Sequence, residues 1–84
     1  MDEIELLKDK YRISKSINAV AYVVYMCNPH ISIVENNEGF KLFCFEKNKE
    51  TDKYYDEYKN NDELYLDIRK FSKIIKMLKK LCKR

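Results

Sequence analysis

A run of nine apolar residues, Ala19–Cys27, constrains the fold of this chain more than any other feature. Ser14 or Ser16 can cap a helix before the run, and Pro29 ends it because the residue before a proline is disfavoured in the helical region. The β-branched content also permits a buried strand, but length favours a helix over 17–28. A helix that is apolar all round needs cover on every side. In 84 residues that cover is hard to supply, so we expect a homodimer.

A β-hairpin is predicted after this helix. The segments 31–35 and 40–46 are rich in strand formers, and 36–39 supplies turn residues between them. Along the second strand one face carries Phe43 and Phe45, and the other carries Phe40, Leu42 and Cys44. Both faces are apolar, and a two-stranded ribbon is marginal in water, so the hairpin must pack on helices.

Two further helices are predicted after the hairpin, over 48–61 and over 68–82, the second capped by Asp67. A short helix at the start of the chain would place Ile4, Leu7 and Tyr11 on one side. The expected fold class is therefore α+β. It is a single domain, 1–84, in which a two-stranded antiparallel β-hairpin packs on two to three α-helices in the order helix–hairpin–helix–helix.

The three cysteines are Cys27, Cys44 and Cys82, an odd number without a C-x-x-C pair. Such spacing is typical of buried thiols in a reducing compartment rather than of a disulfide framework. The acidic start of the chain differs from a signal peptide, and nine apolar residues are too few to span a bilayer. These features predict a cytoplasmic protein without a membrane span.

Charge is distributed unevenly along the chain. All fourteen acidic residues precede residue 68, whereas eight of the seventeen basic residues follow it. On the last predicted helix the basic side chains lie opposite the apolar ones. This face has three interpretations: a solvated surface, a sequence-independent nucleic-acid contact, and a dock for an acidic protein or membrane surface. The candidate contact residues are Arg69, Lys70, Lys73, Lys76, Lys80 and Lys83.

Three tyrosines on the preceding helix, Tyr54, Tyr55 and Tyr58, form a second candidate site. Tyrosine is enriched at the energetic centres of protein interfaces, which favours a protein-binding patch. Packing of two of these rings on the hairpin is the equal alternative.

Catalytic chemistry finds little support in the sequence. His30 is the one histidine, so neither a zinc ligand pair nor a placed general base is indicated. The one glycine, Gly39, falls in the predicted turn, and a phosphate-binding loop needs more. We expect no enzyme activity, no metal and no cofactor.

Several stretches carry a family resemblance: 16–23, Phe43-Cys44-Phe45-Glu46, 58–61 and 67–79. Through their order and spacing the chain resembles a family of short uncharacterised proteins from phages and prophages of clostridia and related Firmicutes. The usual Gly-Phe-like end of the first helix is replaced here by Asn28-Pro29-His30. The resemblance implies a mobile-element origin and the helix–hairpin–helix–helix order.

Two function hypotheses follow. The first is a non-enzymatic accessory protein that binds, and possibly inhibits, a host or defence protein. The alternative is a nucleic-acid-binding accessory or regulatory protein that uses the basic last helix.

Overall fold

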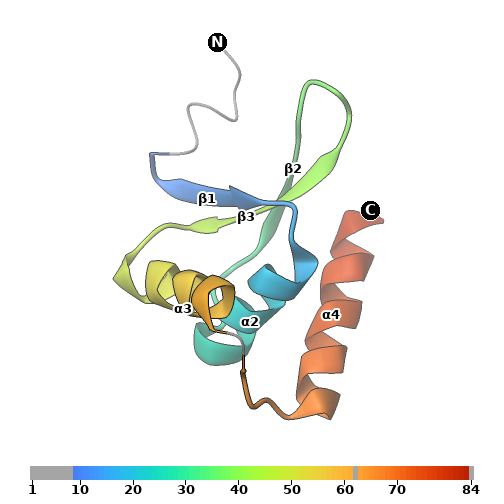
Figure 1. Ribbon diagram of the computed structural model, residues 1–84. Helices are drawn as coiled ribbons and strands as arrows, with labels where there is room; N and C mark the ends of the chain where they lie inside the picture. The colour runs from blue at the N-terminus through green and yellow to red at the C-terminus, as the bar shows by residue number, and fades with distance from the viewer. Residues whose placement is uncertain (1–8, 62, 84) are drawn as a thin grey trace.

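The computed structural model describes residues 9–61 and 63–83. Six elements follow one another along the chain: β1 (Tyr11–Ser14), α2 (Ile17–Cys27), β2 (Ser32–Glu35), β3 (Lys41–Glu46), α3 (Lys49–Asn60) and α4 (Ile68–Cys82). The sheet lies at the top of Figure 1, with α2 and α3 below it and α4 along one side. The α+β prediction is confirmed.

The sheet has three antiparallel strands in the order β1-β3-β2, so the prediction of a two-stranded hairpin was incomplete. The added strand is β1, which pairs with β3 in a register that places Ser14 opposite Phe43. Tyr11 begins this strand rather than ending the predicted first helix. The remainder of that predicted helix lies outside the described residues. Tyr11 and Ile13 alternate with Arg12 and Ser14, but four residues are too few for this alternation to be recognised from sequence.

Helix α2 is the centre of the fold, and its predicted ends are confirmed within one residue. The Ser16 hydroxyl accepts from the Ala19 N–H at 3.3 Å, and Asn28 closes the helix in the left-handed region with a φ of 48°. The six consecutive residues 19–24 are all buried. Since six successive residues point in every direction around a helix, α2 is covered on all sides within one chain.

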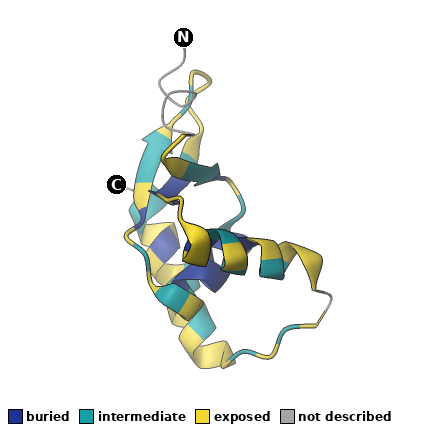
Figure 2. Cartoon of the chain, turned by 90° about the vertical axis from the view of Figure 1, so that its left-hand side faces the viewer, coloured by how far each residue is buried: buried dark blue, intermediate teal, exposed yellow. Residues whose placement is uncertain are grey.

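That cover comes from α3, α4 and the sheet. Helices α3 and α4 both pack on α2, and the side chains of Phe43 and Phe45 join the same core. Figure 2 shows the buried residues gathered inside and the exposed ones around them. The premise that α2 needs a second chain for cover was wrong, and the homodimer stays a prediction.

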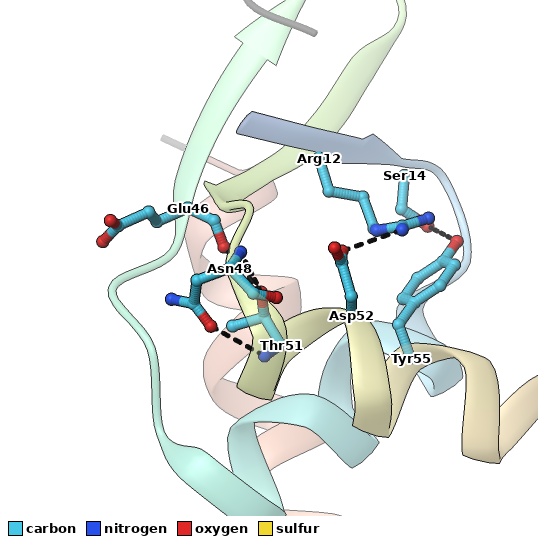
Figure 3. Close-up of polar contacts among 7 residues, drawn as sticks. All are labelled: Arg12, Ser14, Glu46, Asn48, Thr51, Asp52 and Tyr55. Atoms are coloured by element: carbon cyan, nitrogen blue, oxygen red, sulfur yellow. Dashed lines mark hydrogen bonds and ion pairs between the residues drawn. The ribbon is translucent and has the colours of Figure 1, made fainter. Parts of the chain in front are cut away.

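The turn and the start of α3 follow from local chemistry. Gly39, at a φ of +85°, donates to the Asn36 carbonyl at 3.0 Å and closes the β2–β3 turn. At the start of α3, Asn48 and Thr51 exchange hydrogen bonds of 3.0 and 2.9 Å between side chain and backbone. The Thr51 hydroxyl also donates to the Glu46 carbonyl at 2.8 Å (Figure 3). These contacts fix α3 against the end of β3.

Candidate interface on helix α4

Helix α4 begins and ends where the sequence predicts. The Asp67 carboxylate caps it by accepting from the N–H groups of Arg69 and Lys70 at 3.0 and 3.3 Å. At the far end the Lys41 ammonium donates to the Cys82 carbonyl at 2.7 Å, which ties the hairpin to the helix. The helix is thereby held along α2 with both ends anchored.

The basic side chains of α4 all face solvent. The exposed ones within the described residues are Arg69, Lys70, Lys73, Lys76, Lys79, Lys80 and Lys83. The six predicted contact residues are therefore on the surface, as their helical positions indicated. Their contact with an acidic partner stays a prediction.

The apolar side of α4 is only partly covered. Leu78 is fully buried, whereas Phe71, Ile74 and Leu81 are partly buried against the core. Two large apolar side chains of α4 are exposed, Ile68 at 76% and Met77 at 43%. Met77 stands among the lysines, so apolar surface is present inside the basic face.

Two adjoining hollows lie on this flank of α4, with volumes of 390 and 380 Å³. Lys73 and Met77 line both hollows, and we name the two hollows together the α4 groove. Its lining residues are Val24, Tyr25, Asn28, Lys70, Lys73, Ile74, Lys76, Met77, Lys80 and Leu81. No acidic side chain of the described residues lines it. The groove thus combines an apolar floor with a rim of four lysines.

Tyr25 joins the two helices that form the groove. Its hydroxyl accepts from the Asp67 N–H at 3.1 Å. The Lys70 ammonium lies 4.6 Å from the centre of its ring, a cation–π contact. Sequence reasoning missed the contributions of α2 to this site, because they lie more than 40 residues before α4. The usable signal was Met77, an apolar residue on the lysine side of the helix.

The predicted tyrosine patch is largely inside the molecule. Tyr55 is buried, and its hydroxyl is hydrogen-bonded to the Ser14 hydroxyl at 2.8 Å. Tyr54 and Tyr58 are half-buried and contact the ring of Tyr22 with centroids 6.4 and 5.8 Å apart. The alternative interpretation placed two of these rings on the hairpin, whereas Tyr55 contacts Phe45 of β3 and the other two rings pack on α2. An interface role for Tyr54 and Tyr58 stays a prediction, whereas little of Tyr55 is accessible to a partner.

Arg12 strengthens the same junction between β1 and α3. Its guanidinium pairs with the Asp52 carboxylate at 2.9 Å and lies 4.5 Å from the centre of the Tyr55 ring. Figure 3 shows Arg12 and Ser14 reaching from β1 toward Asp52 and Tyr55 of α3. These four residues fasten a strand to a helix, which accounts for their polar contacts without a ligand.

A separate hollow of 330 Å³ lies beside the end of β3 and includes His30, Cys27 and Cys44 in its lining. Burial raises the pKa of both thiols above the usual cysteine value, and the charge of Glu50 adds to the effect on Cys27. Both thiols are thereby kept protonated, the less nucleophilic form. All three cysteines of the chain are free. Within residues 9–61 and 63–83, no group of three His, Cys, Asp or Glu side chains is placed to hold a metal ion.

Comparison with known proteins gives a family match over most of the chain. The family described as Domain of unknown function (DUF5659) matches residues 8–83. Neither a curated protein nor a solved structure matches the chain. Within the described part of the chain, no helix has the length and apolar character needed to cross a membrane.

Proposed function

We propose that this chain, which belongs to the DUF5659 family, is a binding protein whose α4 groove holds an acidic segment of a partner protein. The observation that carries the proposal is the apolar floor inside the basic surface, formed by Ile74, Met77 and Leu81. Protein interfaces typically have an apolar centre, enriched in aromatic residues and methionine, within a polar rim. No acidic side chain of the described residues lines the two hollows beside these lysines, which favours a partner of negative charge.

The resemblance to phage and prophage proteins supports a more specific form of this proposal. A small accessory protein of a mobile element acts by occupying a host or defence protein, and needs no catalytic residues to do so. The α4 groove would then be the surface that occupies the target and thereby inhibits it.

Nucleic-acid binding is the second candidate, and one observation favours it. Six exposed basic side chains lie on one helix of 15 residues, a length of about 22 Å, and Lys83 follows its end. Such a row can neutralise several phosphates and would bind independently of sequence, since lysine provides a point charge rather than a bidentate contact. This candidate leaves the apolar floor without a role.

Capture from host lysate, with and without nuclease and at low and high salt, tests the proposal. One variant carries Lys70→Gln, Lys73→Gln, Lys76→Gln and Lys80→Gln, which removes the rim. Its matched control carries Lys10→Gln, Lys15→Gln, Lys49→Gln and Lys79→Gln, which removes as many exposed charges outside the groove. We expect a discrete protein that survives nuclease, is lost with the rim variant and is retained by the control.

Met77→Ser separates the two candidates, because it leaves every charge in place. A protein partner anchored on the apolar floor binds this variant more weakly, by about tenfold for the loss of one buried anchor. Nucleic acid held through its phosphates is retained unchanged. Equal capture by Met77→Ser and the unaltered chain, together with loss after nuclease, would assign the function to nucleic-acid binding.

A further inference from the structure

The first eight residues of the chain carry acidic side chains, which the described lining of the α4 groove lacks. They hold three acidic residues, Asp2, Glu3 and Glu5, interleaved with Ile4, Leu6 and Leu7. We name residues 1–8 the acidic arm; it precedes the described residues. Residues 1–7 also precede the part of the chain that the DUF5659 family matches. Seven of the eight residues of the acidic arm therefore lie before the matched part of the chain.

The groove and the acidic arm are complementary in charge and in polarity. The groove has four lysines at its rim, an apolar floor and no acidic residue in its described lining. From Lys70 to Leu81 it follows about 16 Å of helix. An extended chain from Asp2 to Leu7 covers about 17 Å. The length, charge and apolar content of the acidic arm thus fit this groove.

We propose that the acidic arm of one copy of the chain occupies the α4 groove of a second copy. This inference rests on the proposed function, since it gives the same groove a second, internal ligand of the same chemistry. Carboxylates of the arm pair with the rim lysines, and its aliphatic side chains cover the floor around Met77. A partner protein must displace the arm from the groove. Self-association therefore lowers the apparent affinity for the partner protein.

The positions of β1 and α4 favour the groove of a second copy over the groove of the same chain. Leu7 lies two residues before Asp9 and Ile4 lies five before it, so they extend at most about 7 and 17 Å from Asp9. Figure 1 places the start of β1 and helix α4 at opposite sides of the molecule. The C-terminal half of α2, which forms one wall of the groove, lies below the sheet.

Sedimentation of the full chain over a range of concentrations tests the inference. We expect the unaltered chain to associate at low salt and to dissociate as salt is raised. The arm variant Asp2→Lys, Glu3→Lys, Glu5→Lys should stay monomeric, and so should the fourfold rim variant with glutamine at Lys70, Lys73, Lys76 and Lys80. The fourfold control outside the groove, Lys10→Gln, Lys15→Gln, Lys49→Gln and Lys79→Gln, should associate as the unaltered chain does.

Mixing the two monomeric variants gives the sharpest result. The rim variant retains an intact arm and the arm variant retains an intact groove, so an equimolar mixture should form a one-to-one heterodimer. An unaltered chain that is monomeric at all concentrations, or an arm variant that associates as strongly as the unaltered chain, overturns the inference.

These outcomes are distinct from failure of the proposed function. The arm variant keeps its groove, and it should capture the partner protein from lysate at least as well as the unaltered chain. Loss of capture in the rim variant with unchanged self-association overturns the arm inference alone. The opposite result is heterodimer formation in the mixture together with capture from lysate that does not depend on the rim. It supports the arm inference and overturns the proposed function.

Discussion

At the scale of single residues, the phenol of Tyr22 is a buried polar group that is paired with a charged one. Tyr22 is 2% exposed, and its hydroxyl donates to the Glu57 carboxylate at 2.7 Å. Burial raises the pKa of this phenol to about 12, and the hydrogen bond and charge of Glu57 add to the effect. The contact holds α3 to α2 as long as the phenol keeps its proton.

The raised pKa predicts a loss of stability in alkali. The unfolded phenol ionises near 10.0, whereas the folded one keeps its proton to about 12. The contribution of Tyr22 to stability is thus complete below pH 10 and is lost as the pH rises from there through about 12. Denaturant unfolding at several pH values, compared with Tyr22→Phe, measures it. Tyr65→Phe is the control, because Tyr65 is 89% exposed; an equal alkaline loss in Tyr22→Phe would contradict the assignment.

At the scale of elements, α4 depends on a single fully buried side chain. Leu78 is 0% exposed, and the other apolar residues of the helix are exposed or partly covered. Leu78 is therefore the fully buried anchor of the helix, and its partly buried apolar neighbours on α4 add to the contact with the core. Because α4 forms one wall of the groove, its attachment also decides whether the groove exists.

Leu78→Ala should lower the free energy of unfolding by about 2–5 kcal/mol, the usual cost of a cavity in a packed core. Met77→Ala, one residue away, should change it by less than about 1 kcal/mol because its side chain is 43% exposed. Urea denaturation compares the two variants. Similar losses of unfolding free energy in both variants would mean that Met77 contributes as much as Leu78 to holding the helix.

At the scale of the whole molecule, a few contacts join segments that are distant in the chain. The Ser14–Tyr55 hydrogen bond connects the first strand to α3 across 41 residues, and Arg12 reaches Asp52 across 40. The Asp67–Tyr25 bond similarly joins α4 to α2. Together with the apolar core, such contacts fix the arrangement of the helices and strands.

Tyr55→Phe tests the first of these connections. It removes the bond to Ser14, whose hydroxyl still accepts from the Ser16 N–H at 3.1 Å. The free energy of unfolding should fall by about 0.5–1.5 kcal/mol, the net value of one hydrogen bond. In Tyr58→Phe, where the ring contact with Tyr22 remains, the change should stay below about 0.5 kcal/mol. Equal stability of Tyr55→Phe and the unaltered chain would show that the bond is replaced by water.

Local chemistry determined much of this protein from sequence alone. The apolar run with Ser16 and Pro29, the cap at Asp67 and the turn at Gly39 predict α2, α4 and the hairpin, because caps, turns and periodicity act over a few residues. The exposure of the lysines on α4 follows from the same helical period.

The tertiary structure alone decided what depends on distant contacts. It added β1 to the sheet, since pairing with β3 rather than its own four residues makes that segment a strand. It buried Tyr55 against β1, and it set Val24 and Tyr25 of α2 beside the lysines of α4 to form the groove. Each of these depends on residues some 30 or more positions apart, and no local pattern of residues encodes which distant surfaces will meet.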